Sequence, residues 1–375
     1  MRIVLLRFNM IYVPALNGLR AFAVMGVLLS HYHLGENYDF IVNMLPWGHI
    51  GVRLFFVLSG FLITSILINC KNIIEKECLS PVLVLRQFYI RRFLRIFPLF
   101  YGVIFLLYFF DFGNIKDVII YHVFFLSNIS SALTGTLIGF PPLIEPATAH
   151  FWSLAVEEQF YLIWPLMVLF ISKKRLLILL VFIIFMSPIL RFLWFFSGYD
   201  LLYSYLPLRV DTLGLGACLA LFRSGEFQPL QGKSFLLKVV FYFSLAFLLG
   251  SFLSHALGIW YRPRLIVMDF FEGIVYAFLM NFIIDAKCKR LNKILENYIL
   301  NYLGSISYGI YILHAFTPHI YSYFFSVKFE SGLLMFCIYT LMTVILAGLS
   351  FSLYESQINR LKKYFPYDYS KSTKE

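Results

Sequence analysis

The sequence predicts an all-α fold, a polytopic transmembrane bundle of about ten helices. Three observations support this fold class. Hydrophobic residues make up 60% of the 375-residue chain and charged residues only 14%, which excludes an ordinary soluble domain. The apolar residues form runs long enough to cross a bilayer, whereas a transmembrane barrel would show short alternating segments. The 43 Phe and 25 Tyr suit helices that face lipid and its interfaces.

Ten apolar runs follow one another along the chain, with a weaker one at 115–131. They cover residues 13–34, 50–69, 96–112, 152–171, 175–196, 203–223, 235–256, 264–284, 301–325 and 332–354. If the weak run does not span, most of the 31 Lys and Arg residues fall on one side together with both chain ends. The positive-inside rule then places the N and C termini in the cytoplasm. Residues 113–150 become a long outer segment with a re-entrant piece around 118–130.

The chain is expected to form a single domain over residues 1–375, ending in a short basic tail from about residue 356. The net charge of +11 is explained first by the orientation signal, so no nucleic-acid partner is expected. The first long run is a full span interrupted by Arg20, and we expect it to stay uncleaved. The five cysteines lack metal-ligand spacing and imply neither a metal site nor a disulfide framework.

The first run carries two ionisable residues, Arg20 and His31. A charge inside a span is costly unless it faces protein, water or a ligand, so the pair indicates a site. Their separation corresponds to about 16 Å of helix axis, comparable to the reach of an extended coenzyme A arm. The alternative is that both are structural polar groups bonded to neighbouring helices.

The strongest basic feature is RQFYIRRFLRIFP at 86–98. Arg95 lies three residues after Arg92 and four after Arg91, so the three are neighbours on a helix and could grip phosphates. The alternative is an anchor for lipid headgroups. Snorkelling to the outer headgroups is the favoured interpretation of a different arginine, Arg53 at the start of the second run.

The stretch AHFWSLAVEEQFYLIWP begins the fourth run. Ser153, Glu157 and Tyr161 share one helix face, whereas the adjacent Glu157 and Glu158 point to different faces. Only one of the two carboxylates is therefore expected on the side of His31.

Three further charged residues lie in later runs. Arg209 cannot face Asp211 directly and should pair across helices or meet an anionic ligand. Asp269 and Glu272 form an acidic pair at helical spacing, which could line an acceptor site or act structurally.

Six segments, in order and covering nearly the whole chain, resemble the acyltransferase-3 family of integral membrane acyltransferases. They are LNGLRAFAVMGVLLSH at 16–31, GVRLFFVLSGFLI at 51–63, RRFLRIFP at 91–98, FWSLAVEEQFY at 151–161, LRVDTLGLGACLA at 208–220 and LGSISYGIYILH at 303–314. Arg53 departs from the pattern, since Asp is frequent at its position. The fused extracytoplasmic hydrolase-like domain of some members is expected to be absent.

The resemblance implies transfer of an acetyl or other short acyl group from cytoplasmic acyl-CoA, such as acetyl-CoA, to a hydroxyl group. The acceptor would be a cell-surface glycan, such as an O-antigen of lipopolysaccharide or an exopolysaccharide, or its lipid-linked precursor. The enzyme would reside in the bacterial inner membrane. Arg20, Arg92 and Arg95, with Arg91 beside them, would bind the coenzyme phosphates.

The resemblance also implies catalytic roles. His31 would act as general base. Tyr161, Tyr308 or Ser153 could donate an oxyanion hydrogen bond or form a transient acyl-enzyme, and Glu157 completes the predicted catalytic set. Substrate contact or support is the expected role of five more residues: Trp152, Arg209, Ser307, Tyr308 and His314. For His314, a structural core histidine is an equally good interpretation.

Two other function classes are less consistent with the sequence. A transporter or flippase for a lipid-linked glycan would be expected to show an internal repeat of broken helices, and none is visible. A glycerolipid acyltransferase would carry the pattern H-x-x-x-x-D, but none of the eight histidines has an Asp five residues later.

Overall fold

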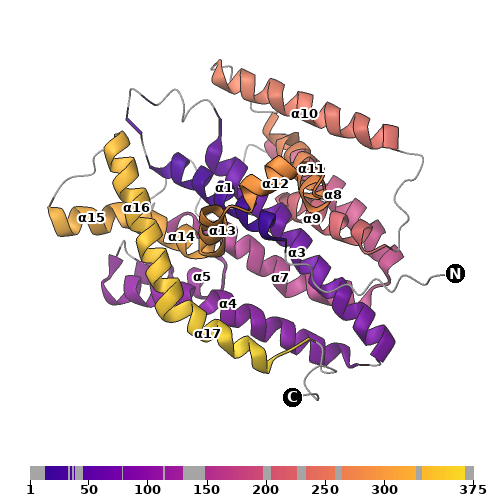
Figure 1. Cartoon of the computed structure of the whole chain (residues 1–375), viewed down its shortest axis with the longest axis horizontal. Coiled ribbons are helices and arrows are strands. Elements are labelled where there is room, and N and C mark those ends of the chain that lie inside the picture. Colours follow the sequence, from indigo (N-terminus) through magenta and orange to yellow (C-terminus); the bar gives the residue numbers. More distant parts are fainter. Residues whose placement is uncertain are drawn as a thin grey trace.

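The protein is a bundle of helices (Figure 1). The computed structural model describes residues 13–32, 34–35, 38, 45–77, 79–112, 115–129, 148–196, 204–225, 234–257, 264–326 and 332–367. Every regular element within these ranges is helical, which confirms the predicted all-α class. Arg2, Arg7, His33, Cys78 and the last eight residues lie outside the described part.

Seven of the described helices are long and apolar enough to cross a membrane. They are α3 (Trp47–Glu77), α4 (Pro81–Phe109), α7 (Phe151–Phe170), α8 (Lys173–Phe196), α10 (Ser234–Ala256), α11 (Arg264–Ile284) and α16 (Leu333–Ser350). The last of these continues through a π-helical turn (Phe351–Glu355), α17 (Ser356–Arg360) and a 3-10 turn (Leu361–Tyr364). The predicted count of ten spans and the predicted orientation stay predictions.

Two predicted spans form shorter helices inside the bundle. The helix α1 (Pro14–His31) has 18 residues and α9 (Val210–Arg223) has 14, which correspond to about 27 and 21 Å of helix. The helices α3, α13 and α14 pack against α1. The helices α3 and α8 pack against α9. Asn17 of α1 and Asp211 and Thr212 of α9 are therefore buried against protein.

The run predicted at 301–325 is broken into pieces. They are α13 (Tyr298–Ser305), α14 (Ser307–Leu313), a 3-10 turn (His314–Phe316) and α15 (Thr317–Phe325). Pro318 accounts for the second break, because it has no N–H for the carbonyl of His314 four residues earlier. That carbonyl instead accepts a hydrogen bond from the Tyr32 hydroxyl, at 2.6 Å. The break turns His314 into the core, where it is 0% exposed.

The weak run at 115–131 does not form a single long helix. The helix α5 (Ile115–Val123) has nine residues, about 13.5 Å, which is too short to cross a bilayer. Val118 and His122 on it are buried, as a re-entrant or partly buried segment requires. The Gln159 side chain fixes the following residues by donating to the carbonyl of Phe125 at 2.9 Å. Residues 130–147 of this segment lie outside the described part.

Small residues let the central helices touch. A Cβ atom on Gly60 of α3 would overlap the carbonyl oxygen of Leu213 in α9, and one on Gly18 of α1 would overlap that of Leu295 in α12 (Lys289–Leu295). Close backbone approach of this kind is typical of membrane helix interfaces. By contrast, α10 lies at the edge of the bundle and packs on α11 (Figure 1).

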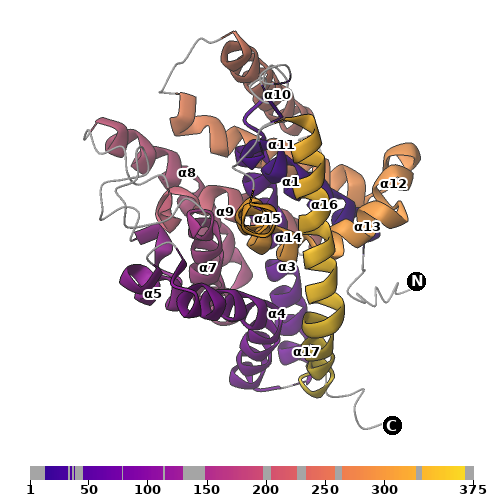
Figure 2. The ribbon, with the colours of Figure 1, turned by 90° about the vertical axis from the view of Figure 1, so that its left-hand side faces the viewer.

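The C-terminal helices run along the bundle and end against α4. Figure 2 shows α16 and α17 as one long column, which contacts α14 with its first part and α4 with its last. The residues after α17 are held by Arg91 of α4, which donates to the carbonyls of Lys362 and Phe365 at 2.8 and 3.1 Å. We call residues 361–367 the C-terminal strap.

Candidate functional site

A cavity of about 100 Å³ lies where α1, α3, α4, α7 and α14 meet. We call it the arginine pocket. Its walls are formed by Arg20, Val52, Phe55, Phe56, Ser59, Arg92, Arg95, Ile96, Ser153, Leu154, Glu157, Glu158, Tyr161, Ser307, Tyr308 and Tyr311. A volume of this order holds about three waters or the tip of a small ligand.

Three arginines line one side of the arginine pocket. Arg92 and Arg95 lie one turn apart on α4 and face Arg20 of α1, which the sequence separates from them by more than 70 positions. Arg20 donates to the Asn17 side chain at 3.0 Å, and the guanidinium of Arg92 lies 5.2 Å from the ring centre of Tyr161. Among the described residues no carboxylate lies within 4 Å of these three guanidinium groups. Like charges gathered without ion pairs favour binding of an anion.

Two glutamates of α7 also line the arginine pocket. Glu157 accepts hydrogen bonds from the Ser59 hydroxyl at 2.8 Å and from the Tyr161 hydroxyl at 3.2 Å. Glu158 also reaches the arginine pocket, because the pocket extends over two adjacent faces of α7. The pocket therefore combines three cations with two carboxylates.

A pair of hydroxyl groups, from α7 and α14, also lines the arginine pocket. Ser153 and Tyr311 have their oxygens 2.5 Å apart, and Tyr311 donates to the carbonyl of His150 at 3.0 Å. Nearby, Tyr308 is fixed by donating to the carbonyl of Ile96 at 2.7 Å. Each of these hydroxyl groups now donates to a backbone carbonyl, so it could donate to an oxyanion in the pocket only by turning away from that carbonyl.

Three histidine rings lie behind the hydroxyl pair, and we call them the histidine cluster. The ring centre of His314 is 4.8 Å from that of His31 and 4.8 Å from that of His150. His314 also lies 5.6 Å from the ring of Tyr311. His31 is the exposed member, because it occupies the last position of α1.

Backbone carbonyls fix which nitrogen of each ring carries hydrogen in the neutral form. Nδ1 of His31 lies 2.9 Å from the carbonyl of Val27, and Nδ1 of His314 lies 2.7 Å from that of Tyr311. A carbonyl only accepts, so both Nδ1 atoms donate and both Nε2 atoms keep a lone pair. Nε2 of His31 is thus set up to act as a base.

The structure brings together most of the residues predicted for the site, but not all of them. The arginine pocket contains Arg20, Arg92, Arg95, Ser153, Glu157, Tyr161, Ser307 and Tyr308. His31 and His314 lie outside it, beyond Tyr311, so the pocket and the predicted base are adjacent regions rather than one cavity. Arg91 points instead to the C-terminal strap, where its guanidinium lies 4.8 Å from the ring centre of Tyr367.

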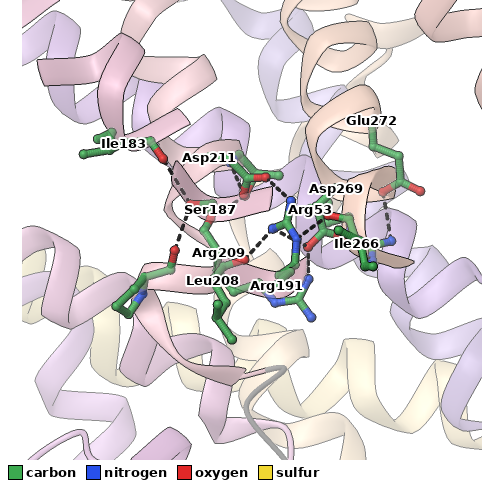
Figure 3. Close-up of polar contacts among 12 residues, drawn as sticks. Arg53, Ile183, Ser187, Arg191, Leu208, Arg209, Asp211, Ile266, Asp269 and Glu272 are labelled. Atoms are coloured by element: carbon green, nitrogen blue, oxygen red, sulfur yellow. Dashed lines mark hydrogen bonds and ion pairs between the residues drawn. The ribbon is translucent and has the colours of Figure 1, made fainter. Parts of the chain in front are cut away.

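A second group of arginines is fully compensated by carboxylates (Figure 3). Asp269 of α11 pairs with three of them, Arg53, Arg191 and Arg209. Two more ion pairs join Arg53 to Glu272 at 2.9 Å and Arg191 to Asp211 at 2.5 Å. We call this set of three arginines and three carboxylates the paired-charge cluster; it links α3, α8, α9 and α11.

The paired-charge cluster tests three predictions made from the sequence. The prediction that Arg53 snorkels to the outer headgroups was wrong, because its side chain is 2% exposed and paired to Asp269 and Glu272. Asp269 and Glu272, the two carboxylates of α11, form ion pairs with arginines of the bundle and therefore act structurally. Arg209 does pair across helices, and its guanidinium lies 5.7 Å from the ring centre of Trp152, so Trp152 faces this cluster rather than the arginine pocket.

Three pocket or cluster residues were not singled out from the sequence. Ser59 of α3 donates to Glu157. Tyr311 lines the pocket and His150 belongs to the histidine cluster. Tyr311 and His150 each stand in a segment that carries the family resemblance or immediately before it, which is the signal that could have identified them. Within the described ranges, no group of His, Cys, Asp and Glu side chains is arranged to hold a metal ion.

Comparison with known proteins gives a consistent result. The family model described as an acyltransferase domain matches residues 13–352. The peptidoglycan O-acetyltransferase OatA of Listeria monocytogenes is 32% identical over 82% of this chain and 50% of its own length. A putative O-acetyltransferase of Staphylococcus aureus is 30% identical over 94% of this chain and 58% of its own.

A third relative, a putative peptidoglycan O-acetyltransferase of Bacillus subtilis, is 31% identical over 81% of this chain and 48% of its own length. The chain thus spans about half the length of the curated relatives it matches. No solved structure matches the chain.

Proposed function

Because the chain belongs to the acyltransferase-3 family, we propose that it is a membrane-embedded O-acyltransferase that moves an acetyl or other short acyl group from acyl-CoA to a glycan hydroxyl. The observation that carries this proposal is the arginine pocket with the histidine cluster behind it. One part offers cations to a phosphate-bearing donor, and the other offers an imidazole to an acceptor hydroxyl.

The arginine pocket supports a coenzyme A thioester as donor. Arg20, Arg92 and Arg95 have no carboxylate within ion-pair distance in the described part of the chain, so phosphate groups would supply the missing negative charge. The cavity of about 100 Å³ suits the acyl thioester tip, and the nucleotide would then lie at its mouth beside α4. Acyl-CoA is a cosubstrate here.

The proposed topology has ten spans with both termini in the cytoplasm, as the distribution of Lys and Arg predicts. In this orientation Arg20 lies toward the cytoplasm and His31, at the other end of α1, lies toward the outside. The donor would enter from one side and the acceptor from the other, in the cytoplasmic membrane of a bacterium.

A glycan of the peptidoglycan type is the acceptor that the relatives favour. Two of the three relatives named above are described as acting on peptidoglycan. This shifts the proposal away from the O-antigen of lipopolysaccharide. The acceptor group itself is a sugar hydroxyl, since the relatives are O-acetyltransferases.

In the proposed mechanism Nε2 of His31 removes the proton of the acceptor hydroxyl as its oxygen attacks the thioester carbonyl. The Ser153 and Tyr311 hydroxyls line the arginine pocket, and on turning away from the carbonyl of His150 they would donate to the developing oxyanion. The C–S bond then breaks, and the thiolate takes up the proton. A transient acyl group on Ser153 would bridge the same distance in two steps.

The proposal is tested with protein purified in detergent, radiolabelled acetyl-CoA and a soluble glycan acceptor. We expect labelled acceptor and free coenzyme A to form at equal rates, and the substitution His31→Ala to abolish transfer. A protein that leaves acetyl-CoA intact with every acceptor would refute the donor assignment. Label that remains on the protein when acceptor is omitted, and disappears in Ser153→Ala, would favour the two-step route.

The acceptor is identified by comparing cell-wall glycans from cells with and without the gene by mass spectrometry. Loss of one acyl mass per modified sugar is expected in the deletion strain, and the size of that mass names the acyl group. Unchanged muropeptides together with a changed surface polysaccharide would move the acceptor away from peptidoglycan.

A further inference from the structure

Glu158 lines the arginine pocket, and the proposed chemistry gives it no role. It follows Glu157 directly on α7, so the two carboxylates point to different faces of the helix. Glu157 accepts from the Ser59 and Tyr161 hydroxyls at 2.8 and 3.2 Å. Glu158 accepts no hydrogen bond and forms no ion pair within the described ranges. One of two adjacent carboxylates is thus satisfied inside the fold, and the other keeps its acceptor oxygens open to the pocket.

The polar groups nearest to Glu158 do not fill this capacity. Tyr101 and Tyr308 lie within range of its charge. Both hydroxyls donate to backbone carbonyls instead, each at 2.7 Å, and a hydroxyl has only one hydrogen to donate. Arg92 is the cation that faces Glu158, but at more than ion-pair distance.

The same holds for every hydroxyl group that the described residues place on the pocket wall, because each already donates within the protein. The pairs are Ser59 and Tyr161 with Glu157, Ser153 and Tyr311 with the carbonyl of His150, Ser307 with that of Gly304, and Tyr308 with that of Ile96. The unfilled capacity of the pocket is therefore of two kinds. The guanidinium groups of Arg92 and Arg95 offer N–H donors, and Glu158 offers acceptor oxygens.

A ligand that matches both kinds of group carries negative charge and, on the same chain, an N–H donor. Acyl-CoA has this chemistry. The pantetheine arm joins its phosphates to the thioester and contains amide groups, and a short ethylene link separates the thioester sulfur from the nearest amide nitrogen. With the phosphates at the arginines and the thioester in the cavity, this amide would lie in the part of the pocket that Glu158 lines.

We propose that Glu158 binds the pantetheine arm of the donor by accepting a hydrogen bond from the amide N–H nearest the thioester. This rests on the proposed function and adds a residue that fixes how far the arm enters the pocket. A hydrogen bond to a carboxylate is stronger than one to a neutral acceptor. Glu158 therefore selects thioesters that carry an amide at this position over thioesters that do not.

The test uses two short thioesters that differ at a single position. One is S-acetyl-N-acetylcysteamine, which carries the amide N–H, and the other has an ester oxygen in its place and cannot donate. Neither carries phosphate, so the arginines do not discriminate between them. For the wild type we expect kcat/KM to be about 10- to 100-fold higher with the amide, the range for one hydrogen bond to a charged group. If neither compound is turned over, their inhibition constants against acetyl-CoA are compared in the same way.

Substitution of Glu158 should remove this preference. In Glu158→Ala we expect equal kcat/KM for the two short thioesters, and a fall of about 10- to 100-fold for acetyl-CoA. Glu158→Gln keeps a neutral acceptor oxygen and should retain part of the preference. Glu296→Ala is the control and should behave as the wild type, since Glu296 is an exposed glutamate directly after α12 and does not line the arginine pocket.

Three outcomes would overturn the inference. They are a wild type that treats amide and ester alike, a Glu158→Ala protein that keeps the preference, and a Glu158→Ala protein whose rates with the two compounds fall equally. If Glu158→Ala does not fold, the wild type and Glu158→Gln decide, because the preference is measured on folded protein in both. A wild type that leaves acetyl-CoA intact would remove the proposed function, whereas transfer from acetyl-CoA without an amide preference would remove only this inference.

Discussion

The paired-charge cluster and the arginine pocket each contain three arginines, yet their surroundings differ. In the paired-charge cluster the side chains of Arg53, Arg191 and Arg209 are at most 7% exposed, and each has a carboxylate within 4 Å. In the arginine pocket Arg20 and Arg92 are half-buried and open to a cavity. No described carboxylate lies within ion-pair distance of them.

The difference teaches how to separate structural from binding charges in a membrane protein. A buried arginine with a protein carboxylate at hand has its charge neutralised inside the fold, and removing either partner leaves the other uncompensated. An arginine next to a cavity and without such a partner is ready to receive an anionic ligand. The residue type is the same in both groups. The difference lies in the surrounding side chains and in the burial they produce.

The largest expected effect is on stability in the paired-charge cluster. Asp269→Ala removes the carboxylate shared by Arg53, Arg191 and Arg209. It should lower the free energy of unfolding by about 3–5 kcal/mol or prevent folding, because it leaves uncompensated buried charge. Thermal unfolding in detergent is the measurement, with Asp285→Ala, a partly exposed ion pair, as control. Equal unfolding temperatures of the two variants would contradict the structural role assigned to the paired-charge cluster.

The second effect is on donor binding in the arginine pocket. Arg95→Ala should raise the KM for acetyl-CoA about 10-fold or more, the range expected for one charged hydrogen bond, and leave the unfolding temperature unchanged. Arg86→Ala, an exposed arginine earlier on α4, serves as control and should change neither quantity. An Arg95→Ala protein that unfolds while its KM is unaltered would assign this arginine to structure instead.

The third effect separates two neighbouring arginines of α4. Arg91 donates to the carbonyls of Lys362 and Phe365 and does not line the cavity. Arg91→Ala should therefore free the C-terminal strap and lower stability by about 1 kcal/mol, with little change in the KM for acetyl-CoA. Limited proteolysis of the strap checks the first expectation and steady-state kinetics the second. A rise in KM as large as that of Arg95→Ala would instead support a phosphate-binding role for Arg91.

The smallest effect concerns an ion pair at the end of α11. Burial opposes the shift, but the hydrogen bond and charge of Arg223, with the charge of Lys287, hold the pKa of Asp285 below its usual value. A carboxyl group whose pKa is lowered in the folded state stabilises the fold at pH values above its unfolded pKa of about 3.9. This stabilisation is lost as the pH falls through the folded pKa. Asp285→Asn should lower stability by less than about 1 kcal/mol at pH 7.

The same comparison at acidic pH checks the sign. The difference in unfolding temperature between wild type and Asp285→Asn should shrink as the pH falls from about 4 through the folded pKa of Asp285, because the carboxyl group becomes protonated over that range. A difference that grows on acidification would contradict the direction assigned to the pKa of Asp285.

Spacing along the chain identified part of the site because it fixes which side chains share a helix face. The interval of three between Arg92 and Arg95, and of four between Ser153, Glu157 and Tyr161, places each set on one line of its helix. The structure shows both sets on the walls of one pocket. Spacing within one helix says nothing about the face it meets on another. For that reason the sequence placed Arg53 at the membrane surface, whereas the structure pairs it with Asp269 and Glu272.

The sequence by itself determined the all-α class, the order of the apolar segments and the local faces, because these follow from composition and helical period. Only the tertiary structure decided which charges find partners. Asp269 lies 216 positions after Arg53, and His150 and His314 are 164 positions apart, yet both pairs are in contact. Burial and charge compensation depend on atoms that distant segments bring together, and so the pairing of Arg53, the contacts of Arg91 and the burial of His314 emerge only in three dimensions.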